Sequence, residues 1–103
     1  KDLMDAPEKR LSIETAQKVV ADHYKVRISD LKARNNSRSV TIPRQVAMYL
    51  AKHLTTASLP EIGRGFGGKH HSTVIHSIRK VEMDRKADND FDRLLNSLIA
   101  SLK

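Results

Sequence analysis

The sequence predicts a small all-α domain. Apolar residues recur at helical spacing along most of the chain, whereas the alternating pattern of a β-strand is absent. The chain has 103 residues, which suits a single domain with a modest core. Only 4% of the residues are aromatic, so we expect a core of leucine, isoleucine, valine and alanine.

Two helices are expected in the first third of the chain. Ser12 is placed to cap the first, because a serine oxygen can accept from the free N–H groups of a helix start. The apolar face of this helix would comprise Ile13, Ala16, Val20 and Tyr24. Ser29 is placed to cap a short second helix through Asp30 and Leu31.

A polar run, residues 33–39, is expected to form a loop that carries Arg34 and Arg38. Thr41 is placed to cap the helix that follows, with Pro43 in its first turn. The apolar stripe of this helix would comprise Val46, Ala47, Leu50 and Leu54.

A short helix, a glycine turn and a longer helix are expected next. Ser58 and Glu61 form the S-x-x-E pattern of a capping box. Gly67 and Gly68 end the short helix, since glycine is common just beyond a helix C-terminus. The longer helix runs from about residue 70 to about residue 86, and its inward side chains would be Val74, Ile75, Ile78 and Val81.

The last helix has the strongest periodic pattern in the chain. Asn89 is placed to cap it, and Asp90 and Asp92 suit the positive end of its dipole. Six apolar residues at helical spacing are expected to pack into the core: Phe91, Leu94, Leu95, Leu98, Ile99 and Leu102.

Positive charge is concentrated in the middle of the chain. The net charge is +7; residues 31–81 hold nine basic residues and one acidic residue, whereas the rest of the chain holds ten basic and eleven acidic residues. Such a segment is typical of a polyanion binder, although a solvated basic face would have the same composition.

Composition also excludes some classes of protein. No cysteine is present, so disulfides and thiolate metal sites are excluded. No apolar run approaches the roughly 20 residues of a membrane span, and there is no signal-peptide pattern, so we expect a cytoplasmic protein. Because the chain starts at Lys1 rather than at a methionine, we expect it to be a piece of a longer protein.

Residues 63–74, GRGFGGKHHSTV, hold all four glycines and two adjacent histidines. The start of this run nearly matches the phosphate-binding P-loop, G-x-x-x-x-G-K-[ST]. However, His70 stands where a serine or threonine would hold magnesium, and no apolar strand precedes the glycines. A nucleotide site is therefore not expected here.

Four histidines raise the alternative of a metal site: His53, His70, His71 and His76. His71 and His76 are five residues apart, off the i, i+4 spacing that places two imidazoles on one helix face, and the motif H-E-x-x-H is absent. We expect no metal, no catalytic residues and no enzyme. A histidine metal site stays open as an alternative that a metal analysis would test.

The same run fits the turn and second helix of a helix-turn-helix. The second helix would open with Lys69, His70, His71, Ser72 and Thr73. In this motif the second helix enters the major groove of DNA, and its N-terminal side chains touch base edges. Hydroxyls can donate or accept there, and a threonine methyl can pack on a thymine methyl. The alternative, that Ser72 and Thr73 only cap the helix, stays open.

Three motifs, in this order, give a resemblance to a known family. They are PRQVAM at residues 43–48, SLPEIGRGFGG at residues 58–68 and HSTVIH at residues 71–76. Together they resemble the C-terminal DNA-binding domain of the bacterial DnaA replication initiators, closely over about residues 13–83. The resemblance implies a Trp-repressor-like helix-turn-helix domain. It also implies sequence-specific binding to double-stranded DNA at the short asymmetric DnaA boxes of a chromosomal origin, with one monomer on each box.

The resemblance also implies which residues contact DNA. Base contacts are implied for Arg44, His70, His71, Ser72, Thr73 and Ser77. Contacts to the DNA backbone or the minor groove are implied for Arg34, Asn36, Ser37, Arg38, Gln45, Lys52, Leu59, Lys69 and His76.

Three departures from the family pattern bear on specificity. His70 stands where an acidic residue is common; a neutral histidine could accept from a cytosine amino group as an aspartate does, but a protonated one could not. Asn36 stands where a family arginine enters the minor groove, so a neighbouring loop arginine would have to replace that contact. Ser72 and Ser77 stand where threonine and alanine are usual, which changes the methyl groups that face thymines.

The rest of the expected protein follows from the resemblance as well. Residues 1–11 would be the end of a helix that links this domain, residues 12–103, to a preceding ATPase domain. That domain would bind ATP, so no cofactor is expected in this chain, and other initiator subunits would assemble through the missing domains. Acidic phospholipids are a further expected partner near the linker helix, and the bacterial nucleoid is the expected location. A helix-turn-helix transcriptional regulator and a basic helical protein-interaction module stay open as alternatives.

Overall fold

The computed structural model describes residues 11–34 and 37–102, and every regular element in these ranges is a helix, which confirms the all-α fold. The helices are α1 (Ile13–Tyr24), α2 (Ile28–Lys32), α3 (Arg38–Leu54), α4 (Leu59–Gly65), α5 (His71–Ala87) and α6 (Asn89–Leu102). The expected linker helix, residues 1–11, lies outside the described residues except for Leu11. No helix in the described part of the chain is long and apolar enough to cross a membrane.

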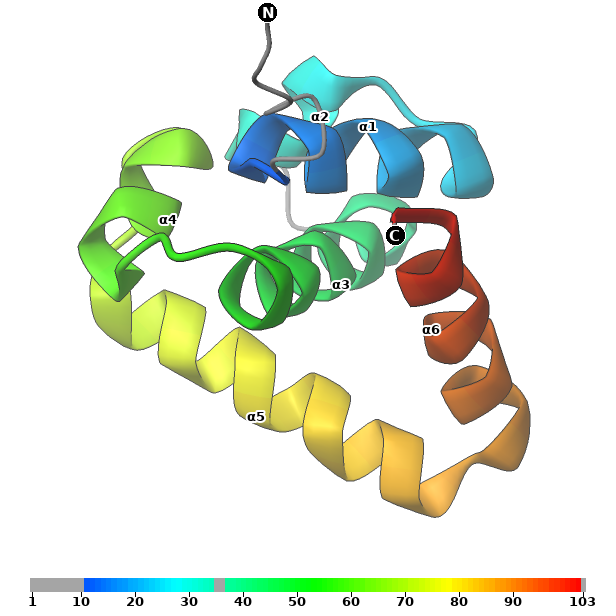
Figure 1. The fold of residues 1–103 in the computed structure, drawn as a ribbon. Helices are drawn as coiled ribbons and strands as arrows, with labels where there is room; N and C mark the ends of the chain where they lie inside the picture. The colour runs from blue at the N-terminus through cyan, green and yellow to red at the C-terminus, as the bar shows by residue number, and fades with distance from the viewer. Residues whose placement is uncertain (1–10, 35–36, 103) are drawn as a thin grey trace, which may run out of the picture.

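Helix α3 forms the centre of the molecule. It packs between α1 on one side and α5 on the other, and α6 turns back from the end of α5 towards α1 (Figure 1). Its predicted stripe is confirmed, because Val46, Ala47 and Leu50 are fully buried. The other helices add apolar side chains to the same core: Ala16, Val20, Leu31, Ile62, Phe66, Val74, Val81, Leu95 and Leu98. The apolar periodicity of the sequence therefore predicted most of the inward side chains, but Ile75 was wrong, because it is half-buried and does not belong to the core.

Two of the predicted helix starts are confirmed in atomic detail. The Ser12 side chain accepts from the backbone N–H of Thr15 at 3.1 Å. The Ser58 side chain accepts from the N–H of Glu61 at 3.2 Å, and the Glu61 carboxylate accepts from the N–H of Ser58 at 2.8 Å, which completes the capping box. This backbone hydrogen bond from Ser58 lowers the pKa of the Glu61 carboxyl.

Three predicted caps are wrong, because a neighbouring residue starts the helix instead. Helix α2 begins at Ile28, since the Asp30 carboxylate accepts from the backbone N–H of Arg27 at 3.1 Å; Ser29 lies inside the helix. Helix α6 begins at Asn89, since the Asp88 carboxylate accepts from the N–H groups of Asp90 at 3.0 Å and Phe91 at 3.2 Å. Asp88 therefore takes the capping role that Asn89 was predicted to have.

Helix α3 also begins earlier than predicted, so the loop before it is shorter. It starts at Arg38, and the N–H of Thr41 bonds to the carbonyl of Ser37 at 2.8 Å. Thr41 is therefore inside the helix, and Pro43 lies in the second turn rather than the first. A proline there cannot donate to the carbonyl four residues before it. At the start of the helix, the N–H groups of Val40 and Thr41 both donate to the carbonyl of Ser37.

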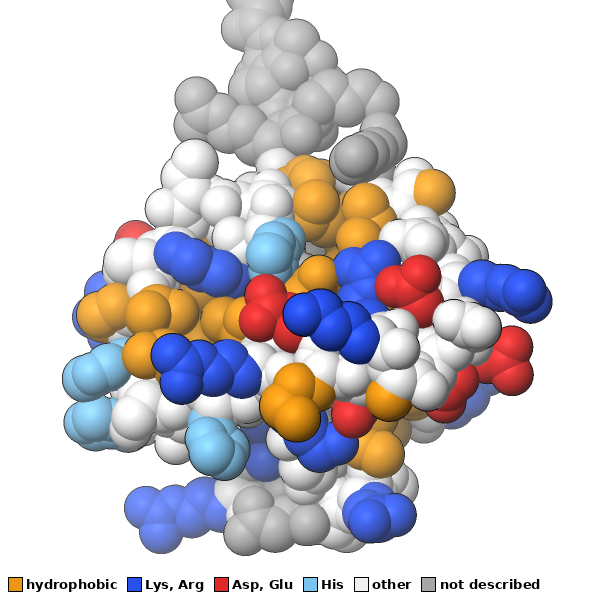
Figure 2. Space-filling view, turned by 90° about the horizontal axis from the view of Figure 1, so that it is seen from below, with side chains coloured by type: hydrophobic (Ala, Val, Ile, Leu, Met, Phe, Trp, Pro, Cys, Tyr) orange, Lys and Arg blue, Asp and Glu red, His pale blue; other side chains and the backbone are white. Residues whose placement is uncertain are grey.

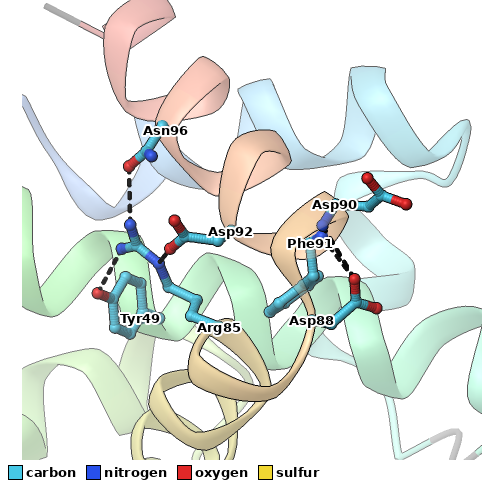
Figure 3. A network of polar contacts seen from close by, with 7 residues as sticks. All are labelled: Tyr49, Arg85, Asp88, Asp90, Phe91, Asp92 and Asn96. Carbon is cyan, nitrogen blue, oxygen red and sulfur yellow. Dashed lines mark hydrogen bonds and ion pairs between the residues drawn. The ribbon is translucent and has the colours of Figure 1, made fainter.

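Arg85 joins three helices at the far end of α5 (Figure 3). Its guanidinium donates to Asp92 at 2.6 Å, to the hydroxyl of Tyr49 at 2.8 Å and to the side-chain oxygen of Asn96 at 2.7 Å. Tyr49 belongs to α3, and Asp92 and Asn96 belong to α6. One side chain thus fixes the orientation of α5 and α6 relative to α3.

Candidate nucleic-acid interface

Helices α4 and α5 and the turn between them have the geometry of a helix-turn-helix. Gly67 and Gly68 have φ values of 85° and 81°, the left-handed conformation that favours glycine. The N–H groups of Gly68 and Lys69 both donate to the carbonyl of Gly63, at 3.0 and 2.8 Å. A Cβ at Gly63 would lie 2.2 Å from the Lys69 carbonyl oxygen, so this turn can form only over a glycine. The predicted glycine turn is confirmed.

The first turn of α5 is exposed and is capped by a histidine. His70 is the cap, and its ring nitrogen Nδ1 accepts from the backbone N–H of Ser72 at 3.1 Å. The His70 and His71 rings stack with their centroids 4.4 Å apart. Ser72 and Thr73 are exposed within the helix, so the alternative in which these two residues only cap it is wrong.

A groove between α3 and α5 brings together residues that lie about 30 positions apart in the sequence. Six of the residues implied to contact DNA line it: Arg44, Gln45, Ser72, Thr73, His76 and Ser77. Thr73 and His76 are exposed, whereas Ser77 is only 6% exposed. Ser77 is therefore much less accessible than its neighbours along this helix face. Arg44 is also buried, at 6% exposure.

Arg44 and Lys69 hold the C-terminal end of α2. The Nε of Arg44 donates to the carbonyl of Leu31 at 3.1 Å, and its Nη2 donates to that of Ala33 at 3.0 Å. The Lys69 ammonium donates to the carbonyls of Ala33 at 3.2 Å and Phe66 at 3.0 Å. We call these two cations and their carbonyl partners the carbonyl clamp. The clamp fixes the start of the loop after α2 against both α3 and the glycine turn.

The clamp has an electrostatic cost. Burial lowers the pKa of the Arg44 guanidinium. Burial also lowers the pKa of the Lys69 ammonium, and the positive charges of Arg44 and Arg34 lower it further. Carbonyl oxygens at the end of a helix carry partial negative charge, which offsets part of this repulsion. Lys69 therefore has a structural role in addition to the phosphate contact that the resemblance implies.

The remaining predicted contact residues that the structure describes do not line this groove. Arg34, Ser37 and Arg38 are exposed beside the loop, and Ser37 shares a hydrogen bond with the hydroxyl of Ser39 at 3.1 Å. Asn36 lies outside the described residues. Lys52 and Leu59 line a separate hollow with Ile75, Ile78 and Arg79. The structure therefore does not bring them into the α3–α5 groove.

Thr41 lines the groove although the sequence did not single it out as a contact residue. Its side-chain oxygen is buried and has no hydrogen-bond partner in the structure. The sequence spacing could have indicated that Thr41 lines the groove, because Thr41 and Gln45 are four residues apart and share one face of α3. Thr41 was assigned to capping instead.

Charge is distributed unevenly over the surface on the α5 side. Figure 2, which is seen from that side, shows histidines gathered towards the end of the molecule where α5 begins, with lysines and arginines along the face. Most of the acidic side chains in this view lie towards the other end, among further lysines and arginines. Glu82 and Asp84 belong to the second half of α5, and Asp88 follows its last residue. Lys80 is paired there with Asp84 at 2.7 Å. The beginning of α5 is thus the end suited to an anionic partner.

The histidines of the described part of the chain are not gathered into one cluster of possible metal ligands. No group of three or more His, Cys, Asp or Glu side chains there could hold a metal ion. His53 lies on α3 instead, with its ring 4.3 Å from that of Tyr49 and its Nε2 3.8 Å from Glu82.

The fold and the groove define a helix-turn-helix domain whose second helix is exposed along its first turn. The model of the family described as "Bacterial dnaA protein helix-turn-helix" matches residues 13–81. The chain belongs to this family.

Two relatives agree with this assignment. The chain is 47% identical over 95 residues to the chromosomal replication initiator protein DnaA of Symbiobacterium thermophilum. That match covers 92% of the chain and 21% of the relative, so the chain spans about a fifth of its length. A solved structure titled "Crystal structure of DNA replication initiation factor" superposes with a TM-score of 0.79 at 34% identity, over 92% of this chain and 28% of that one.

Proposed function

We propose that this domain binds double-stranded DNA at DnaA boxes of a chromosomal replication origin, as the DNA-binding part of a larger, ATP-dependent initiator. The observation that carries the proposal is the α3–α5 groove, which assembles polar and basic side chains beside the exposed start of α5. Family membership and the relative's name support the same function. ATP binding and assembly into an initiator would belong to the parts of the protein outside this chain.

In the proposed complex, the start of α5 lies in the major groove. Ser72 and Thr73 are exposed in its first turn and face base edges, since this is where a helix-turn-helix reads sequence. Arg34 and Arg38 flank the loop and contact the backbone or the adjacent minor groove. Phosphate contacts position the domain, and the few base contacts specify the site.

Fluorescence anisotropy tests this proposal directly. The domain is titrated onto two labelled duplexes, one with a DnaA box and one with the same bases scrambled, across a salt series. We expect tight binding to the box that weakens with salt, and much weaker binding to the scrambled duplex. Equal binding to both duplexes would contradict specific recognition by this domain, and no salt-dependent binding would favour a protein-interaction module.

The Thr73→Ala variant is expected to lose specific affinity. Removing the hydroxyl and methyl of an exposed residue in the first turn of α5 should cost roughly 1–3 kcal/mol on the box. Binding to the scrambled duplex should change little, because that binding rests on phosphate contacts. Equal losses on both duplexes in the anisotropy assay would remove Thr73 from the base contacts.

The Lys52→Ala variant is expected to weaken binding to both duplexes by a similar factor. Lys52 is exposed on α3 and lies outside the α3–α5 groove, so it is suited to a phosphate rather than to a base. Losing one phosphate contact should reduce the slope of log affinity against log salt by about 1. An unchanged slope would show that Lys52 makes no such contact.

A further inference from the structure

His70 uses one ring nitrogen inside the protein. Its Nδ1 lies 3.1 Å from the backbone nitrogen of Ser72, whose N–H can only donate. Nδ1 must therefore be the unprotonated nitrogen of the ring. In the neutral imidazole the proton then resides on Nε2, which is a donor. The helix cap thus fixes the tautomer of an exposed histidine at the start of α5.

The same hydrogen bonds fix the polarity of the Ser72 hydroxyl. Its Oγ lies 2.7 Å from Nδ1 of His70. Because Nδ1 carries no proton, the contact is attractive only if the hydroxyl donates its single hydrogen to the ring. Only the lone pairs of Oγ remain for another partner, so Ser72 presents an acceptor. The stacked ring of His71, with its centroid 4.4 Å from that of His70, holds the imidazole in place.

We propose that His70 and Ser72 act as a specificity-determining pair of fixed polarity, with His70 Nε2–H as a donor and Ser72 Oγ as an acceptor. This inference rests on the proposed function. The donor fits an acceptor on a base edge, and guanine offers two of them, O6 and N7. The acceptor fits the exocyclic amino group of adenine or cytosine. The expectation that neutral His70 accepts from cytosine is thereby reversed, because the accepting nitrogen is already occupied within the helix cap.

An isosteric pair of variants tests the polarity. In His70→Asn and His70→Asp, one side-chain oxygen can cap α5, since both residues are good N-caps. The second atom differs: the asparagine amide donates, as His70 does, whereas the aspartate oxygen can only accept. Anisotropy is measured for the parent and both variants on duplexes in which each base pair of the preferred site is changed in turn. Melting temperatures confirm that all three proteins are folded.

The parent and His70→Asn are expected to prefer a guanine at the same position of the site. His70→Asp is expected to lose roughly 10-fold on that guanine and to prefer cytosine there. Identical preferences for the Asn and Asp variants would overturn the proposal, as would losses that are equal for every base pair, which indicate a phosphate contact. If the parent distinguishes no duplex from a scrambled one, the proposed function fails as well. Specific parent binding with unchanged variant preferences overturns only this inference.

Discussion

The Gly67→Ala variant is expected to be destabilised by about 2–4 kcal/mol, one of the two largest effects that we expect from a single substitution. Gly67 has a φ of 85°, and a Cβ built there would lie 2.1 Å from the backbone oxygen of Lys32. That oxygen belongs to the last residue of α2, so it cannot move away as a flexible side chain would. The turn must shift instead, and Lys69 shifts with it out of the carbonyl clamp. Urea unfolding followed by circular dichroism measures the loss.

Gly68→Ala is the matched control for this variant. Gly68 has nearly the same φ, 81°, but a Cβ there would meet nothing within 4 Å. Its substitution should cost only the strain of the left-handed conformation, about 1–2 kcal/mol. The difference between the two variants therefore isolates the close approach of the turn to α2. Equal losses of stability would show that this approach has no energetic consequence.

The helices and their inward faces could be predicted because each depends on local spacing. The capping box of Ser58 and Glu61 is local in the same way and is present as predicted. The caps at Ser29, Thr41 and Asn89 were wrong although they too are local. In two of these places a nearby aspartate accepts from the free N–H groups instead, and a pattern of residue types does not rank two competing acceptors.

The carbonyl clamp could not be predicted from periodicity or motifs. Its bonds join Arg44 to Leu31 across 13 residues and Lys69 to Ala33 across 36 residues. The resemblance to a DNA-binding family assigned both side chains to DNA, and nothing in the sequence indicates that they also hold the end of α2. The resemblance implied the contact residues but not the groove that they line. The packing of α3 on α5 brings six of them together there.

The carbonyl clamp predicts that Arg44 stabilises the fold, in addition to making the base contact proposed for it. Arg44→Ala removes one donor from each of the carbonyls of Leu31 and Ala33. Lys69 still donates to Ala33, but the buried bond to Leu31 is lost, and a buried carbonyl without a partner costs about 1–3 kcal/mol. The loss of the proposed base contact should cost roughly another 1–3 kcal/mol of affinity for the box. Arg44→Lys should recover little of either, because a single ammonium cannot reproduce the two-pronged geometry of a guanidinium. Urea unfolding and anisotropy on the box measure the two losses separately.

Arg38→Ala is the control for Arg44→Ala, because it separates an effect on DNA binding from an effect on stability. Arg38 is exposed at the first position of α3, where a positive charge opposes the helix dipole. Its removal should leave stability within about 0.5 kcal/mol of the parent while it weakens binding to box and scrambled duplexes alike. If Arg44→Ala shows that same pattern, its contacts to α2 contribute nothing to the fold. Arg44→Ala is expected instead to lose both stability and specific affinity. That result would show that one side chain both holds the loop after α2 in place and contacts the DNA.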